Sequence, residues 1–171
     1  MQGTTVAAIV LCSTPETYVR RAALAALASL CRPVVVIAED SARKEVAGLP
    51  VDVVVSTAIG AGLEAALIST PHLDAAVFLR ADQPYVTAGS IRHLLDAFQQ
   101  THLPIAAAAY EHRVDLPALF ARQMFAELRA LPQGANPKGI IEQFADRVAS
   151  VTMPEAAAEI ESFAEMEALK R

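Results

Sequence analysis

The sequence predicts a single α/β domain over residues 1–171, with a mostly parallel β-sheet and helices on both faces in three layers. Two observations support this fold class. Apolar runs of strand length alternate with stretches of helix length, which is typical of parallel strands joined by right-handed crossovers. No internal repeat, linker or low-complexity segment divides the chain, and its 171 residues suffice for one domain with a substantial core.

The first half of the chain contains four expected strands. They are residues 5–11 (TVAAIVL), 33–40 (PVVVIAED), 51–56 (VDVVVS) and 74–82 (DAAVFLRAD), all short apolar runs of the kind found in buried strands. A helix should follow the first strand, because Ser13 and Glu16 have the spacing of a capping box and leucines recur behind them. A second helix is expected at residues 60–70, ending before Pro71.

The second half continues the alternation of strands and helices. Thr87 is expected to cap a helix that runs to about residue 100, because threonine is a preferred N-cap residue. The remaining expected elements are a strand at 104–110, a short strand at 115–120, helices at 122–130 and 139–144, a strand at 147–153 and a helix at 159–171.

Composition excludes several classes of function. Hydrophobic residues make up 54% of the chain and aromatic residues 5%, so alanine and small aliphatic side chains should fill the core. The net charge is −5 and no basic stripe occurs, which argues against nucleic acid or an anionic membrane as a partner. No apolar run approaches the ~18 residues of a membrane span, and no positive segment precedes the first apolar run. The two cysteines form no disulfide or metal framework, so we expect a reduced, cytoplasmic protein.

Asp82 is the first candidate functional residue. It follows the fourth apolar run in the segment VFLRADQPYVT and precedes Gln83 and Pro84. Ligands of open α/β sheets bind outside the carboxyl ends of the strands, and this rule places Asp82 at such a site. Asp82 could equally cap a turn whose backbone Pro84 fixes, and its position alone leaves both interpretations open.

The segment FLRADQPYVTAGSIRHLLDAF resembles the strand, A-D-Q-P motif and threonine-capped helix of MobA-like nucleotidyltransferases, in particular the molybdenum cofactor cytidylyltransferase type. Other segments are similar to this family in the same order: AIGAGLEAAL to G-M-S-x-S-L-x-x-G-L, AYEHRVDLPALF to a tyrosine turn and G-x-P-x-L-F, PKGII to K-G-A, and EIESFAEMEAL to D-I-D-T-P-E-D-L. The resemblance covers about residues 5–169. It implies a Rossmann-like, nucleotide-diphospho-sugar transferase-like domain that transfers CMP or GMP from CTP or GTP to molybdopterin, with Mg²⁺ and release of pyrophosphate.

The resemblance also implies roles for particular residues. The aspartate of A-D-Q-P binds Mg²⁺ in the family, so Asp82 is the candidate catalytic residue and metal ligand; Mg²⁺ takes hard oxygen ligands and neutralises charge on the phosphates. The family's second acidic motif falls on Glu159 and Glu161, so glutamates stand here where the family has aspartates. These glutamates could instead form an acidic helix N-terminus favoured by the helix dipole. Candidate nucleotide-binding residues are Gly60, Gly62 and Lys138.

The phosphate-binding loop of the family is missing from the sequence. The family follows its first strand with L-A-A-G-x-S-x-R-M-G-x-x-K, whose amides and cations hold the triphosphate. Here the corresponding segment is AAIVLCSTPETYVRR, without a glycine or the matching lysine. The serines of S-x-S-L fall on Gly60 and Gly62, and the glycine of G-x-P falls on Asp115. Each lost charge-assisted contact typically costs about 1.5–3 kcal/mol.

Two hypotheses follow from these departures. Either the protein is a nucleotidyltransferase of this type that works with a shortened loop, or it keeps the fold, has lost catalysis and serves as a binding or assembly module for a protein partner. Because the missing loop supplies the anion site, we favour loss or severe weakening of catalysis. Mg²⁺, the nucleoside triphosphate and the molybdopterin-like acceptor are expected ligands of the active alternative.

Other functional classes agree less well with the sequence. A dinucleotide-binding domain needs G-x-G-x-x-G after its first strand, and LCSTPE lacks it. Cys12 ends a strand before a helix, which suits either a reactive thiol or a small buried cysteine. The four histidines have no metal-ligand spacing, and Tyr110 could pack in its turn or line a pocket.

Overall fold

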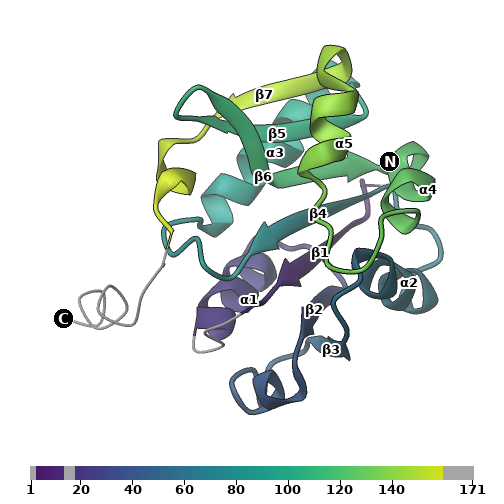
Figure 1. The fold of residues 1–171 in the computed structure, drawn as a ribbon, viewed down its shortest axis with the longest axis vertical. Coiled ribbons are helices and arrows are strands. Elements are labelled where there is room, and N and C mark those ends of the chain that lie inside the picture. The colour runs from purple at the N-terminus through teal and green to yellow at the C-terminus, as the bar shows by residue number, and fades with distance from the viewer. Residues whose placement is uncertain (1–2, 14–17, 160–171) are drawn as a thin grey trace.

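The computed structural model describes residues 3–13 and 18–159 of the chain, and within them seven strands form one sheet (Figure 1). The strands are β1 (Val6–Leu11), β2 (Val34–Ala38), β3 (Asp52–Val55), β4 (Ala75–Arg80), β5 (Ile105–Tyr110), β6 (Arg113–Ala121) and β7 (Val148–Thr152). Their order is β3-β2-β1-β4-β6-β5-β7. All neighbours are parallel except β6, which is antiparallel to both β4 and β5. The predicted mostly parallel α/β sheet is confirmed.

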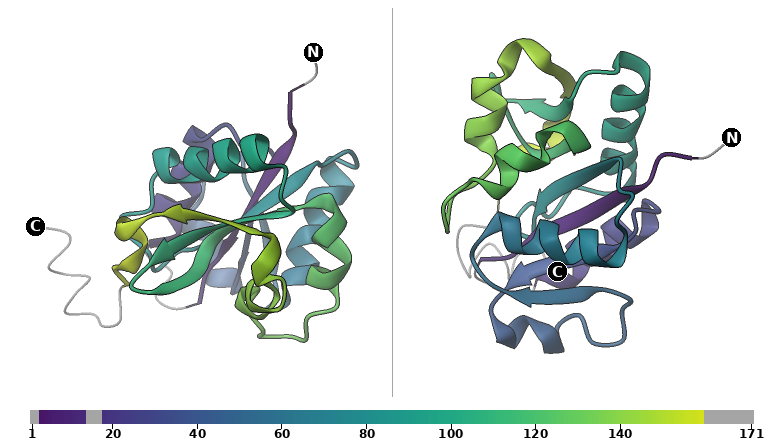
Figure 2. Two further views of the ribbon diagram at one scale, coloured as in Figure 1. Left: turned by 90° about the horizontal axis from the view of Figure 1, so that it is seen from above. Right: turned by 90° about the vertical axis from the view of Figure 1, so that its right-hand side faces the viewer.

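Helices cover both faces of this sheet, as Figure 2 shows. The described helices are α1 (Val19–Ala28), α2 (Ile59–Ser69), α3 (Ala88–Thr101), α4 (Phe125–Arg129) and α5 (Lys138–Gln143), with 3₁₀ turns η2 (Asp40–Lys44), η3 (Arg122–Met124), η4 (Ala145–Arg147) and η5 (Pro154–Ala157). One core lies between the sheet and α1, α3 and η5, and the other between the sheet and α2, α4 and α5. Alternate residues of one strand enter opposite cores, as Ala8 and Ile9 do in β1.

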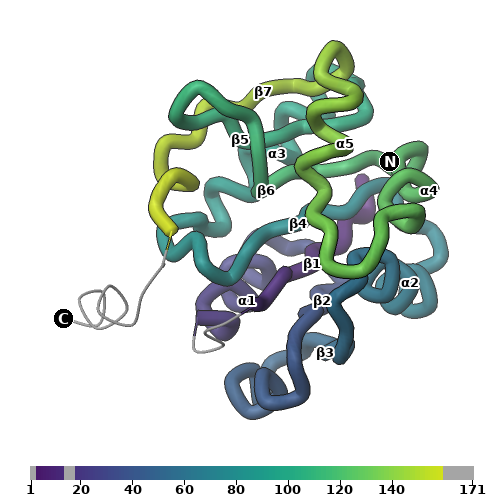
Figure 3. Tube along the Cα trace, in the orientation of Figure 1, coloured from purple at the N-terminus to yellow at the C-terminus, as the bar shows by residue number. Residues whose placement is uncertain are grey.

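The first four strands of the sequence form one half of the sheet and the last three form the other half, as can be traced along the chain in Figure 3. β4 therefore lies in the middle of the sheet. The helix that follows β4 begins as predicted. Thr87 is its N-cap, its side chain accepts from the amide of Ser90, and the Ser90 hydroxyl accepts from the amide of Thr87.

Strand β6 is longer than the short strand predicted at residues 115–120, because its ends also pair with β5 and β4, and it contains Pro117. The pairing of β5 with β6 shifts between Ala107, opposite Ala118, and Ala108, opposite Asp115. Residues 116 and 117 therefore fall in an irregularity of the ladder, where the missing N–H of proline costs no ladder hydrogen bond. The strand continues on both sides, from Arg113 to Ala121.

Other predicted boundaries changed or lie outside the described residues. The helix expected at 122–130 is a 3₁₀ turn followed by α4. The Glu16 half of the predicted capping box and nearly all of the helix expected at 159–171 fall outside the described ranges. Among the described helices, none is both long and apolar enough to span a bilayer.

Candidate functional site

A pocket of about 350 Å³ lies at the carboxyl ends of β1 to β4, where the topology of an open α/β sheet favours ligand binding. Its wall is formed by the residues after β1, the β3–α2 connection, the turn after β4 and the loop before α5. Leu11, Ile37 and Ile59 supply apolar surface, and among its described lining residues the charged ones are Arg80 and Asp82. The pocket therefore combines an apolar wall with one concentrated polar edge.

Local hydrogen bonds fix the loops around this pocket. The Ser56 hydroxyl accepts from the amide of Ala58 at 3.0 Å, which shapes the start of α2. The amide of Gly134 donates to the carbonyl of Thr57 at 3.0 Å and so holds the loop before α5 against the β3–α2 connection. Gly134 has a φ of 78°, a conformation that favours glycine. Two separate segments are thus joined into one wall.

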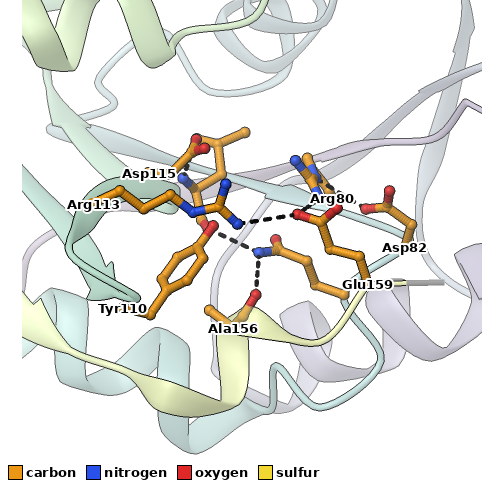
Figure 4. A network of polar contacts seen from close by, with 9 residues as sticks. Arg80, Asp82, Tyr110, Arg113, Asp115, Ala156 and Glu159 are labelled. Carbon is orange, nitrogen blue, oxygen red and sulfur yellow. Dashed lines mark hydrogen bonds and ion pairs between the residues drawn. The ribbon is translucent and has the colours of Figure 1, made fainter. Parts of the chain in front are cut away.

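Arg80 lies between two carboxylates at the polar edge of the pocket (Figure 4). Its Nε donates to Asp82 Oδ1 at 2.9 Å, and its Nη2 lies 2.6 Å from Glu159 Oε1. The second contact is an ion pair by distance, although the N–H bonds of Nη2 are not aligned with that oxygen. Arg113 Nη2 lies 3.6 Å from the same Glu159 oxygen. We call these four residues the Arg80 cluster.

Three of the four residues of the Arg80 cluster are largely shielded from solvent, whereas the side chain of Arg113 is 40% exposed. The side chains of Arg80, Asp82 and Glu159 are 21%, 30% and 25% exposed. Burial by itself lowers the pKa of the Arg80 guanidinium, but the charges of Asp82 and Glu159 outweigh it and raise that pKa above its ordinary value. Arg80 therefore stays a cation whose charge is balanced inside the protein.

Gln83 holds together the segments that carry this cluster. It is buried in the turn after β4, and its Nε2 donates to the carbonyls of Leu116 at 2.9 Å and Ala156 at 3.0 Å. The first bond reaches β6 and the second reaches η5, shortly before Glu159. Its Oε1 is buried without a hydrogen-bond partner among the described residues. The glutamine of the A-D-Q-P segment is thus a structural tether.

The β5–β6 hairpin places Arg113 in the Arg80 cluster. Tyr110 and Arg113 are paired across the hairpin, and the Arg113 guanidinium lies 4.8 Å from the centre of the Tyr110 ring. The Tyr110 hydroxyl donates to the carbonyl of Leu116 at 3.3 Å. Burial, followed by the charge of Asp115, raises the pKa of Tyr110. Tyr110 is buried and does not line the pocket, so it packs in its turn, one of the two roles that the sequence left open.

The structure brings some of the predicted site residues together and separates others. Asp82 and Glu159 both contact Arg80, whereas Glu161 lies outside the described residues. Lys138 begins α5, its Nζ is 3.9 Å from Glu142 Oε1, and it lines a different pocket of about 260 Å³ between α5, β6 and β7.

Gly60 and Gly62 lie in the first turn of α2, and close packing accounts for the glycine at position 62 but not for the one at position 60. A Cβ at Gly62 would lie 2.5 Å from Ile37 Cδ1, and a Cβ at Gly60 would lie 3.4 Å from the Cα of Arg129. Neither glycine lines the pocket at the carboxyl ends of β1 to β4. A direct role of Gly60, Gly62 or Lys138 in nucleotide binding stays a prediction.

The Arg80 cluster does not fit a divalent metal ion. A hard cation such as Mg²⁺ needs carboxylate oxygens with free lone pairs, and the guanidinium of Arg80 already occupies the space between the two carboxylates. Within residues 3–13 and 18–159, no three His, Cys, Asp or Glu side chains are arranged to hold a metal ion. Asp82 and Glu159 each form an ion pair with Arg80 here, and the metal role expected of them stays a prediction.

Sequence reasoning missed Arg80, Gln83 and Arg113. Arg80 had a usable signal, because it is a charged residue that ends an otherwise apolar buried strand. Glu159 was already a candidate through the family resemblance, but its contact with Arg80 had no signal, because the two residues are far apart in the sequence.

Comparison with known proteins matches residues 11–149 to the family model described as the MobA-like NTP transferase domain. Rv0371c from Mycobacterium tuberculosis H37Rv is similar in structure, with a TM-score of 0.77, 21% identity and 98% of each chain covered. The structure of Rv0371c in complex with manganese has a TM-score of 0.74 and 22% identity, covering 97% of this chain and 98% of that one.

The 4-diphosphocytidyl-2C-methyl-D-erythritol synthase of Anaerococcus prevotii DSM 20548 has a TM-score of 0.69 at 12% identity, covering 99% of this chain and 100% of that one. No curated protein matches the sequence. At such identities the structural likeness establishes the α/β fold shared with nucleotidyltransferases.

Proposed function

Because the chain belongs to the MobA-like NTP transferase domain family, we propose that its pocket binds a nucleoside phosphate, whereas the nucleotidyl transfer of the family is lost or strongly weakened. The observation that carries the proposal is the pairing of Arg80 with Asp82 and Glu159, the two candidate metal ligands within the described residues. The resemblance to the cytidylyltransferase type makes CTP, GTP and a molybdopterin-like acceptor the first ligands to test.

The shape and chemistry of the pocket support binding of a nucleoside. Its volume of about 350 Å³ lies in the range of small-molecule sites, which are mostly apolar with a few placed polar groups. Leu11, Ile37 and Ile59 offer apolar contacts to a base. Ser13 and Thr57 also line the pocket, and their hydroxyls are suited to bonding a ribose.

The charges around the pocket argue against a strong triphosphate site. A triphosphate needs several cations or backbone amides, and Arg80, the one cation among the described lining residues, is already paired. The segment after β1 has no glycine, and its cations are the arginines of α1 rather than the lysine of the family loop. Three missing charge-assisted contacts would cost about 5–9 kcal/mol, or roughly three to six orders of magnitude in affinity.

Thermal unfolding of the full chain tests binding. CTP, GTP, ATP and the matching diphosphates would each be added at millimolar concentration, in EDTA and in Mg²⁺. A ligand at about 100 times its Kd adds about 2.7 kcal/mol, which raises the midpoint by roughly 5–10 °C in a domain of this size. We expect at least one nucleotide to raise the midpoint in EDTA. No shift with any nucleotide would contradict the binding proposal.

Pyrophosphate release measured on the same samples tests the loss of transfer. We expect no release above the protein-free rate, with or without a molybdopterin-like acceptor. Magnesium-dependent release that disappears in Asp82→Asn and persists in Asp96→Asn, a matched change on the exposed face of α3, would show that transfer survives.

A further inference from the structure

We propose that Arg80, assisted by Arg113, is the resident cation of this pocket and excludes a divalent metal ion from it. The proposal deepens the proposed function, on which it rests only for the nature of the ligand: the nucleoside phosphate would bind in its metal-free form. Four observations support the inference.

The first is the position of the guanidinium. Arg80 Nε is 2.9 Å from Asp82 Oδ1 and Arg80 Nη2 is 2.6 Å from Glu159 Oε1, so one side chain spans both carboxylates. A metal ion bridging Asp82 Oδ1 and Glu159 Oε1 would lie about 2.1 Å from both oxygens, and the guanidinium of Arg80 now contacts both of them. Metal entry therefore requires Arg80 to leave the cluster.

The second is the charge balance. Two carboxylates and one divalent cation sum to zero, and so do Asp82, Glu159, Arg80 and Arg113. A metal ion added to the cluster would create a net charge of +2 beside two guanidinium groups. Since like charges at such short range repel strongly in a partly buried site, the arginines act against the metal even before any steric clash.

The third is burial. The surface pair of Arg43 with Asp40 has side chains that are 56% and 79% exposed, whereas Arg80 and Glu159 are 21% and 25% exposed. Water and salt screen an exposed pair and make it weak. A largely buried pair is screened less, so removing Arg80 leaves carboxylate charge that must be compensated, here by a cation from solution.

The fourth is the way the cluster is held. Gln83 donates to the carbonyl of Ala156 at 3.0 Å, and the Ser90 hydroxyl donates to Glu155 Oε2 at 2.8 Å, so two bonds fasten the segment just before Glu159. Arg113 is held in turn by its position over the Tyr110 ring. The arrangement is thus built by contacts outside the ion pairs themselves.

Mn²⁺ titration of the full chain tests the proposal without any nucleotide. Free Mn²⁺ would be followed by electron paramagnetic resonance in wild type, Arg80→Met, Arg80→Met/Asp82→Asn and Arg129→Met. Methionine keeps the volume of the arginine stem and removes the charge. Arg129 is the matched control, because its ion pair with Glu64 at 2.7 Å is exposed and lies outside the pocket lining.

We expect no Mn²⁺ binding below millimolar concentration in wild type and Arg129→Met, a gain of at least about tenfold in Arg80→Met, and loss of that gain in the double variant. Micromolar Mn²⁺ binding by wild type that Asp82→Asn abolishes would overturn the proposal, whether or not the Arg80 variants fold. A folded Arg80→Met that binds no more Mn²⁺ than wild type would overturn it as well.

The nucleotide experiment separates this proposal from the proposed function. Wild type that binds neither Mn²⁺ nor any nucleotide would refute the nucleoside-phosphate proposal and support the exclusion of metal. Wild type that binds a nucleotide only when a divalent metal is added would overturn the exclusion of metal and support nucleotide binding.

Discussion

Replacing Gln83 by methionine should lower the free energy of unfolding by about 2–4 kcal/mol, because the change removes two buried hydrogen bonds and keeps the side-chain volume. The carbonyl of Ala156 loses its bond of 3.0 Å from Gln83, which costs about 1–3 kcal/mol. The carbonyl of Leu116 loses a bond of 2.9 Å but keeps the Tyr110 hydroxyl at 3.3 Å, so its loss is nearer about 1 kcal/mol. Methionine also removes Oε1, which has no hydrogen-bond partner among the described residues, and this offsets a small part of the loss.

Urea unfolding of wild type and Gln83→Met measures this loss directly. The transition midpoint should fall with an unchanged slope, and the thermal midpoint should drop by roughly 5–15 °C. Gln100→Met is the matched control, because Gln100 is exposed on α3 and the same replacement there should change stability by less than about 0.5 kcal/mol. A loss below about 1 kcal/mol for Gln83→Met would refute the view that Gln83 fastens β6 and η5 to the turn after β4.

Three further predictions concern stability. Gly62→Ala should lower the free energy of unfolding despite the better helix propensity of alanine, because the new Cβ would lie 2.5 Å from Ile37 Cδ1. Gly60→Ala should raise the free energy of unfolding by up to about 1 kcal/mol. Urea unfolding compares the two variants, and equal effects would contradict the packing argument. His112→Gly should raise the free energy of unfolding in urea by about 1 kcal/mol, because His112 has a φ of 61° in the hairpin turn, and an unchanged or lower value would contradict that strain. The folded state raises the pKa of Tyr110 from 10.0, so its ionisation favours the unfolded chain and stability should fall as the pH rises above 10. In urea unfolding, the difference in free energy of unfolding between wild type and Tyr110→Phe should therefore shrink between about pH 8.5 and about pH 10.5. A constant difference would argue against the raised pKa.

Most strands could be predicted from the sequence because the central strands are buried on both faces. β1, β2 and β4 appear as continuous apolar runs, which leave little freedom in their placement. The length of β6 was underestimated because its ends, Arg113, Val114 and Ala121, are strand residues only through their pairing with β5 and β4, which the sequence does not show. The cap at Thr87 was predictable because it is a local interaction, and local interactions are visible in a short window of sequence.

The position of the pocket follows from topology, whereas its electrostatics do not. Strand order and the carboxyl-end rule place Asp82 at the pocket before any side chain is known. The contact of Arg80 with Glu159 depends instead on how η5 packs against the turn after β4, which Gln83 determines from a buried position. A glutamine in a turn gives no sign in sequence of which distant carbonyls it will bond.

A carboxylate at the end of a buried strand binds whichever cation reaches it with the smallest loss of free energy from desolvation and ordering. An arginine two residues away competes for Asp82 at an effective concentration of order millimolar or higher, and it does so without shedding the tightly held waters of a magnesium ion. Glu159 strengthens this competition, because it stabilises the guanidinium on its other side. With an uncharged residue at position 80, the same two carboxylates would have unfilled lone pairs and would recruit a cation from solution. The residue that precedes the A-D-Q-P segment, rather than its aspartate, therefore decides which cation this edge of the sheet accepts.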